Sequence, residues 1–150
     1  MKEKVIVYKT VIARPLKEVF EFFSKAENLD SLTPPHLKFK IITPTPIPMF
    51  AGQLIKYKIS LFGIPFYWKT RITEWIPGKK FADEQLSGPY TKWYHEHLFE
   101  EINGSTHMVD RITYLSKGWI FAPLLHWLFV DKNVIGIFEY REQRLKELFK

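Results

Sequence analysis

The sequence predicts an α+β domain in which a curved antiparallel sheet of about seven strands wraps around one long C-terminal helix, with two short helices after the first strand. Segments of alternating apolar and polar residues follow one another between turn signals, as antiparallel strands do. The C-terminal segment has a helical pattern instead, and no other segment is long enough to cover the apolar face of such a sheet. We therefore expect one domain spanning residues 1–150.

The N-terminal region predicts one strand and two short helices. Glu3–Ala13 alternates and is rich in β-branched residues, which favours a strand, and Arg14-Pro15 ends it. Apolar residues then recur at the spacing of a short amphipathic helix: Leu16, Val19, Phe20 and Phe23. A second short helix is expected over Asn28–Leu32, before Pro34-Pro35.

Six further strands are expected between residues 37 and 114. Turn signals separate them, and Asn103-Gly104 is the strongest of these because both residues tolerate positive φ. The expected strands are Leu37–Thr43, Gln53–Leu61, Phe66–Ile76 and three more within Phe81–Tyr114. A two-residue turn at Asn103-Gly104 predicts the pairs Phe99 with Met108, His97 with Asp110, His95 with Ile112, and Trp93 with Tyr114.

One face of Phe81–Tyr114 combines large aromatic side chains with carboxyl and imidazole groups. Buried polar groups need partners, so this mixture is more typical of a pocket lining than of a plain core. The register places His97 opposite Asp110 within hydrogen-bonding reach, and Asp83 near Trp93 or His95. The candidate catalytic residues are therefore His95, His97, Asp83 and Asp110.

This polar cluster has four interpretations. It can be a buried network that orders the sheet, or an anchor that orients an apolar ligand. It can also carry out general acid/base chemistry, or bind a metal, although no third ligand at a suitable spacing supports a metal site. No nucleophile elbow or Gly-rich phosphate loop is present, so we expect neither a metal nor a cofactor.

The predicted C-terminal helix runs from about residue 123 to 149 and would span about 40 Å. Its apolar side, which includes Leu124, Leu128, Ile135 and Phe138, is expected to face the sheet. Aromatic residues near its start could form an entrance gate: Trp119, Phe121, Trp127 and Phe129. The candidate ligand-binding residues are Tyr57, Trp68, Ile72, Phe81, Asp83, Trp93, His95, His97, Phe99, Met108, Asp110, Ile112, Tyr114, Leu128 and Ile135.

Composition and charge predict where the protein is located and which classes of partner it contacts. Cysteine is absent and no signal peptide is visible, which favours a cytoplasmic protein. The net charge is +6, and basic residues share the predicted outer face of neighbouring strands: Lys38, Lys40, Lys56, Lys58, Lys69 and Arg71. This face is either simply solvated or makes transient contact with an anionic membrane. Aromatic residues are sparse there, so no nucleic-acid partner is expected, and the oligomeric state stays open.

The order of elements resembles the START-like, or SRPBCC, superfamily with its helix-grip fold. Local motifs are similar to a bacterial and archaeal cyclase/dehydrase-like branch. They are Asn28-Leu29, Leu32-Thr33-Pro34-Pro35, Gly63-Ile64-Pro65 with Trp68, Phe81-Ala82-Asp83-Glu84-Gln85, Gly88-Pro89-Tyr90 with Trp93, His95 and His97, Asp110 with Tyr114, and Phe138-Glu139-Tyr140-Arg141. The resemblance implies a cavity for a hydrophobic small molecule and no agreed catalytic set.

Three function classes follow. The first is binding, transport or sequestration of a lipid, isoprenoid, quinone or polyketide-like compound between the sheet and the helix. The second is an enzyme, a cyclase, dehydratase or hydrolase that uses the Asp/His cluster in the same cavity. The third is a protein-interaction module. A superfamily with lipid carriers, cyclases, hormone binders and chaperone activators does not decide between them.

Overall fold

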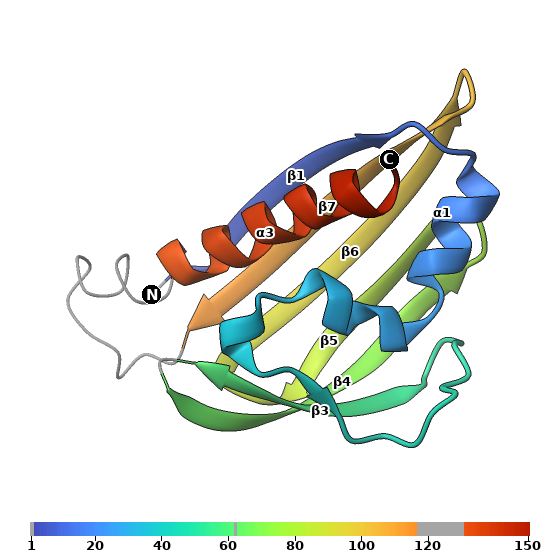
Figure 1. Ribbon diagram of the computed structural model, residues 1–150. Coiled ribbons are helices and arrows are strands. Elements are labelled where there is room, and N and C mark those ends of the chain that lie inside the picture. The colour runs from blue at the N-terminus through green and yellow to red at the C-terminus, as the bar shows by residue number, and fades with distance from the viewer. Residues whose placement is uncertain (1, 62, 117–130) are drawn as a thin grey trace.

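The computed structural model describes residues 2–61, 63–116 and 131–150. A seven-stranded antiparallel sheet in the order β1-β7-β6-β5-β4-β3-β2 curves around the C-terminal helix α3, as Figure 1 shows. The strands are β1 (Lys4–Ile12), β2 (Lys40–Ile41), β3 (Leu54–Leu61), β4 (Ile64–Ile76), β5 (Lys80–Ser87), β6 (Tyr90–Ile102) and β7 (Ser105–Ser116). The helices are α1 (Leu16–Phe23), the short 3-10 helices η1 (Ala26–Leu32) and η2 (Pro35–Leu37), and α3 (Lys132–Leu148). This is the helix-grip arrangement that the sequence predicts.

The hairpin of β6 and β7 has the predicted register. Asn103 and Gly104 both have positive φ, 52° and 79°, and Ile102 pairs with Ser105 beside them. All the predicted pairs follow: Phe99 with Met108, His97 with Asp110, His95 with Ile112, and Trp93 with Tyr114. The polar residues of these two strands therefore lie on one face of the sheet.

The second strand is much shorter than predicted. We expected a strand over Leu37–Thr43, but the strand covers only Lys40–Ile41, and Leu37 ends the 3-10 helix η2. Ile42 and Thr43 still donate backbone hydrogen bonds to Lys56 of β3. Pro35 begins that helix, and Lys38 follows it in the left-handed region with φ 49°. Proline favours the first turn of a helix, and the backbone at Lys38 cannot extend a strand. Leu37 still faces inward and is fully buried.

Helix α3 packs one side against the sheet. Its buried residues are Val134, Phe138, Arg141 and Leu145, and the Phe138 ring stacks on Tyr8 of β1 with centroids 5.4 Å apart. Ile135, predicted to face the sheet, is only half-buried. The first part of the predicted helix and the predicted gate lie outside the described residues, including Leu124, Leu128, Trp119, Phe121, Trp127 and Phe129. Among the described residues, no helix is long and apolar enough to cross a membrane.

The apolar core has two main parts. One lies beneath α1, where Phe99 and Met108 pack with Phe23 and with Leu145 of α3. The other surrounds Trp68 and Trp93, and its other buried members are Leu37, Ile59, Leu61, Tyr90, Ile112, Tyr114, Val134 and Phe138. Between these two parts the concave face of the sheet carries its polar residues.

Candidate functional site

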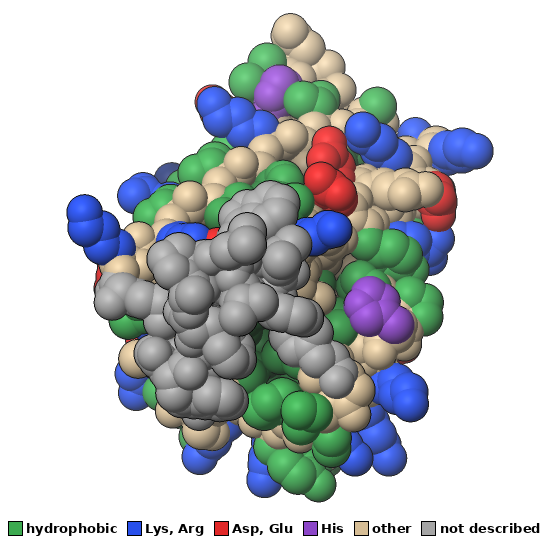
Figure 2. All heavy atoms as spheres, turned by 90° about the vertical axis from the view of Figure 1, so that its left-hand side faces the viewer, with side chains coloured by type: hydrophobic (Ala, Val, Ile, Leu, Met, Phe, Trp, Pro, Cys, Tyr) green, Lys and Arg blue, Asp and Glu red, His purple; other side chains and the backbone are tan. Residues whose placement is uncertain are grey.

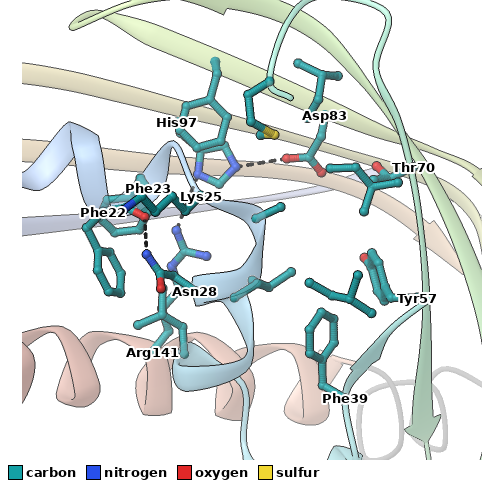
Figure 3. A pocket seen from close by; sticks show the side chains of 18 residues that line it. Phe22, Phe23, Lys25, Asn28, Phe39, Tyr57, Thr70, Asp83, His97 and Arg141 are labelled. Carbon is teal, nitrogen blue, oxygen red and sulfur yellow. Dashed lines mark hydrogen bonds and ion pairs between the residues drawn. The ribbon is translucent and has the colours of Figure 1, made fainter. Parts of the chain in front are cut away.

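A cavity of two lobes lies between the sheet, the short helices and α3. The first, which we call the Phe lobe, has a volume of about 90 Å³. The second, the Trp lobe, has a volume of about 120 Å³ and includes Trp68 and Trp93 in its wall. Both lobes share the residues Leu29, Leu32, Phe39, Tyr57, Asp83, His97 and Arg141. Figure 3 shows the Phe lobe, with Tyr57 and Phe39 on one side and His97, Asp83 and Arg141 at its polar end.

The two imidazoles lie in a stack of rings on β5 and β6. The His95 and His97 rings have centroids 3.7 Å apart, and the Phe81 ring lies against His97 at 4.0 Å. Alternation along β6 puts both imidazoles on the concave face. Both are buried, with 5% of the surface of each exposed. Their orientation is therefore fixed by packing as well as by hydrogen bonds.

The hydrogen bonds of the cluster run diagonally between strands. His95 Nε2 lies 2.7 Å from Asp110 Oδ1, and His97 Nε2 lies 3.0 Å from Asp83 Oδ2. The predicted contact between His97 and Asp110 is present but slightly longer than expected, with His97 Nδ1 3.3 Å from Asp110 Oδ1. The shorter hydrogen bond of His97 goes to Asp83 instead. The twist of the sheet brings diagonal neighbours within reach, so correct Cα pairing does not ensure that opposed side chains form the shortest hydrogen bond.

Arg141 adds a positive charge to the cluster from α3. Its Nη2 lies 3.2 Å from Asp110 Oδ1 and 3.4 Å from His97 Nδ1. The guanidinium also lies over the rings of Phe23 and Phe138, at 5.3 and 5.9 Å from their centroids. Only 6% of this residue's surface is exposed. Figure 3 shows it extending from α3 toward His97, so the helix as well as the sheet supplies polar groups.

Burial and charge act in opposite directions on these groups. Burial alone would raise the pKa of Asp110, but the Arg141 charge and the His95 hydrogen bond hold it well below its usual range. The same balance, with His97 as the main partner, lowers the pKa of Asp83. Burial lowers the pKa of His95 to about 4, aided by His97 and opposed by Asp110. At neutral pH both carboxyls are therefore ionised and His95 is neutral.

Three ligand atoms in this cluster lie close enough together to hold a metal ion. One atom each from Asp83, His95 and His97 lies within 4.8 Å of the other two. The imidazole Nε2 atoms already bind carboxylates, and the buried Arg141 cation lies beside His97. A metal ion would have to displace these hydrogen bonds, so the geometry favours a hydrogen-bonded network over a metal site.

Several predicted ligand-binding residues do line the cavity. Those in the walls of the two lobes are Tyr57, Trp68, Ile72, Phe81, Asp83, Trp93, His95 and His97. Asp110 lies behind the imidazoles, outside both walls, and Ile135 is also outside them. Phe99, Met108, Ile112 and Tyr114 lie in the packed core instead, because α1 and α3 press onto that part of the concave face. Leu128 lies outside the described residues.

Sequence analysis missed the part of the wall that does not come from the long strands. Leu29 and Leu32 enter from η1, and Phe39 from the irregular segment after η2. In the sequence, Arg141 stands out only as the last residue of the family-like motif Phe138-Glu139-Tyr140-Arg141. It lies three residues after Phe138 and seven after Val134, on the apolar side of α3. A charged residue on an apolar helix side indicates a buried polar partner, and this signal could have identified it.

The fold and cavity define a START-like, helix-grip protein. Residues 12–146 match the family described as polyketide cyclase / dehydrase and lipid transport, and the chain belongs to that family. Among curated proteins, no match was found.

Solved structures share the fold at low sequence identity. The Zhui aromatase/cyclase from Streptomyces sp. R1128 is 14% identical with a TM-score of 0.77, over 97% of this chain and 93% of that chain. A START superfamily protein from Mycobacterium smegmatis is 12% identical with a TM-score of 0.68, over 96% of this chain and 98% of that chain. A nucleoside-diphosphate sugar epimerase from Corynebacterium glutamicum is 22% identical with a TM-score of 0.68, over 95% of this chain but 28% of that chain.

Proposed function

We propose that the protein binds a hydrophobic small molecule in the two-lobed cavity, and so carries or sequesters it. A lipid, isoprenoid, quinone or polyketide-like compound has the required apolar surface. The observation that carries the proposal is the lining: mostly aromatic and aliphatic side chains surround the polar cluster and a few other polar groups, which is the usual composition of a small-molecule site. The family description, which includes both lipid transport and cyclase, agrees with this class of ligand.

A matched pair of substitutions on β3 tests binding in the cavity. Ile55 is buried in the wall of the Phe lobe, whereas its neighbour Leu54 points outward and is exposed. Ile55→Phe should weaken binding of the neutral dye Nile red by about tenfold, because overfilling a packed site costs about 1–3 kcal/mol. Leu54→Phe should leave the affinity unchanged. Equal affinities in both variants would contradict cavity binding.

The natural ligand can be identified separately. Native mass spectrometry of the protein purified from its own host should show a mass increment, and the fraction of protein that carries it should be lower in Ile55→Phe. Extraction and fragmentation of the released compound would then give its chemical class.

Acid/base catalysis is the second candidate function, and the Asp83–His97 pair favours it. His97 lines both lobes, and its Nε2 bonds a partly buried carboxylate that can orient the imidazole. A binder should release the compound found by native mass spectrometry unchanged, and His97→Ala should lose affinity modestly. An enzyme should convert that compound with a bell-shaped pH profile, and His97→Ala should abolish the conversion while the compound still binds.

The outer face of the sheet suggests that the protein also contacts anionic membranes transiently. Lysines oppose each other directly across neighbouring strands, Lys56 with Lys69 and Lys40 with Lys58. Directly opposed like charges destabilise a sheet, so an anionic surface that neutralises them would be favourable. At the bottom of Figure 2, on the β3–β4 side of the molecule, Lys and Arg side chains gather.

A further inference from the structure

Two buried hydrogen-bond donors in the Trp lobe have no acceptor among the described residues. They are Trp68 Nε1 and Arg141 Nε. The exposed surface of these residues is 4% and 6%, and both side chains line this lobe. Leaving a buried donor unpaired costs about 1–3 kcal/mol. A fold that keeps two such donors in one cavity wall is suited to receive an acceptor from a ligand.

The way in which Arg141 binds Asp110 leaves the Nε of the guanidinium without an acceptor among the described residues. One nitrogen, Nη2, contacts one oxygen, Oδ1, and that same oxygen also receives the His95 hydrogen bond. A guanidinium can bind an acceptor group through two parallel N–H bonds, and this arrangement uses only one nitrogen. The carboxylate therefore fixes the position of Arg141 without occupying its Nε.

The charges of the cluster favour an uncharged acceptor. Asp83 and Asp110 contribute two negative charges and Arg141 contributes one positive charge. Even a protonated His97 would only bring the sum to zero, so an anionic ligand would add an uncompensated buried charge. Lys25, the other basic residue of the Phe lobe, is exposed and therefore screened by water.

We propose that the ligand of this cavity carries a neutral oxygen acceptor, such as the carbonyl of a ketone, quinone or ester, that accepts hydrogen bonds from Trp68 Nε1 and Arg141 Nε. The inference rests on the proposed binding function and narrows its ligand class. Hydrocarbons fill the apolar walls but leave both donors unpaired. Carboxylates pair with the donors but bring a negative charge next to Asp110.

Three probes of similar size separate these cases: acetophenone, ethylbenzene and benzoate. Their affinities for the whole chain are measured by calorimetry in wild type, Trp68→Phe and Trp93→Phe. The quantity compared is the ratio of the ethylbenzene to the acetophenone dissociation constant, because this ratio cancels effects common to both ligands. Trp93 is the control, since it lines the same lobe but its nitrogen is not among the buried, unpaired atoms of the described residues.

Trp68→Phe should lower this ratio by about fivefold, the equivalent of one net hydrogen bond, with ethylbenzene affinity retained. Trp93→Phe should leave the ratio unchanged. Arg141→Lys keeps the charge but loses Nε, and it should lower the ratio to a similar degree. Benzoate should bind wild type at least about tenfold more weakly than acetophenone, because of the buried carboxylates.

Other outcomes overturn the inference. Trp68 and Trp93 meet edge-on, with centroids 5.3 Å apart and planes at 89°, so the Trp68 N–H could be satisfied by a ring face instead. In that case Trp68→Phe would not change the ratio, although ethylbenzene and acetophenone would still bind, and the proposed binding function would stand. Tighter binding of benzoate would overturn the neutral acceptor. Failure of all three probes to bind would count against both proposals.

Discussion

At the scale of single residues, Asp110 holds the cluster together through one oxygen atom. Oδ1 accepts from His95 Nε2 at 2.7 Å and from Arg141 Nη2 at 3.2 Å, and only 2% of the residue is exposed. Removal of this carboxylate leaves a buried cation and a buried imidazole donor without their partner. The stability of the cluster depends on this residue, and so does the ligand-binding role that we propose for the cluster.

We expect Asp110→Ala to lower the free energy of unfolding by about 2–4 kcal/mol, because it strands the Arg141 charge and the His95 donor. Denaturant unfolding followed by circular dichroism measures the change. Asp30→Ala, at an exposed position, is the control and should be nearly neutral. A loss no greater than that of the control would mean that the cluster contributes nothing to stability.

The pH dependence of stability should reflect His95. Its pKa in the folded protein is lowered from 6.5 to about 4, chiefly by burial. Between these two values the unfolded chain binds more protons, so stability is fully present above the upper value and is lost as pH falls. Across this pH range, the lowered pKa of His95 accounts for a loss of up to about 3 kcal/mol in the free energy of unfolding. His95→Gln keeps a donor for Asp110 and should lose less stability between pH 7 and pH 4 than wild type does.

Unfolding in denaturant at a series of pH values tests this expectation. His36→Gln removes an exposed histidine and is the control, so its stability should follow the wild-type curve. Identical pH dependence in wild type and His95→Gln would show that His95 does not titrate over this range.

The sequence predicted which residues share a face, but not which side chains form the shortest hydrogen bonds. Alternation and the Asn103-Gly104 turn were sufficient to place Asp83, His95, His97 and Asp110 on the concave face. The partner choice depends on sheet twist and on Arg141, whose position requires knowing how α3 packs. Neither the twist of the sheet nor the position of Arg141 can be obtained from strand periodicity.

At the scale of elements, α3 is anchored by polar contacts at its start. The Tyr114 hydroxyl donates to Asp131 Oδ1 at 2.6 Å, and Lys4 of β1 pairs with the other carboxylate oxygen. Tyr114 and Asp131 are both buried. Burial, the Asp131 hydrogen bond and its charge all raise the pKa of Tyr114, so the phenol stays protonated and remains a donor. β7 and α3 are therefore joined directly.

Tyr114→Phe should destabilise the protein by about 1–2 kcal/mol, because the buried Asp131 loses a donor while the ring is retained. Hydrogen exchange of the α3 amides should accelerate with it. Tyr67→Phe removes a hydroxyl from a side chain that is 60% exposed and should change neither quantity. Unchanged α3 exchange in Tyr114→Phe would mean that apolar packing alone anchors the helix.

Long elements with strong periodicity and the short helices α1 and η1 were predicted well, whereas the short strand β2 was not. β6, β7 and the described part of α3 have many residues that agree on one pattern, so single exceptions do not matter. β2 has two residues, and the chain around it follows the local preferences of Pro35 and Lys38. Those residues place Leu37 and Phe39 in the Trp lobe, which explains why part of the cavity wall escaped prediction.

At the scale of the whole molecule, the two faces of the sheet have different chemistry. The concave face holds the cavity, its polar cluster and α3 (Figure 1). On the outer face of β3 and β4, Tyr67 lies between basic side chains, with the ammonium groups of Lys56 and Lys58 at 5.4 and 6.0 Å from its ring. An aromatic ring flanked by lysines is typical of membrane interfaces. The two proposed functions, ligand binding and membrane contact, therefore use opposite faces of the sheet.

The double variant Lys58→Glu with Lys69→Glu separates membrane contact from folding. It replaces both like-charged pairs by opposite ones, since Lys58 opposes Lys40 and Lys69 opposes Lys56. Stability should therefore rise slightly, by about 0.2–1 kcal/mol per pair. Binding to phosphatidylserine-containing vesicles at low salt should fall at least about tenfold, because each basic residue near the surface contributes about 1 kcal/mol.

Lys2→Glu with Lys9→Glu is the matched control for this experiment. It makes the same change of charge near β1, at the opposite edge of the sheet from β2. Sedimentation with vesicles should show nearly wild-type binding for this variant if the basic face of β3 and β4 makes the contact. An equal loss in both double variants would mean that only net charge matters, and no wild-type binding at all would remove the membrane role of this face.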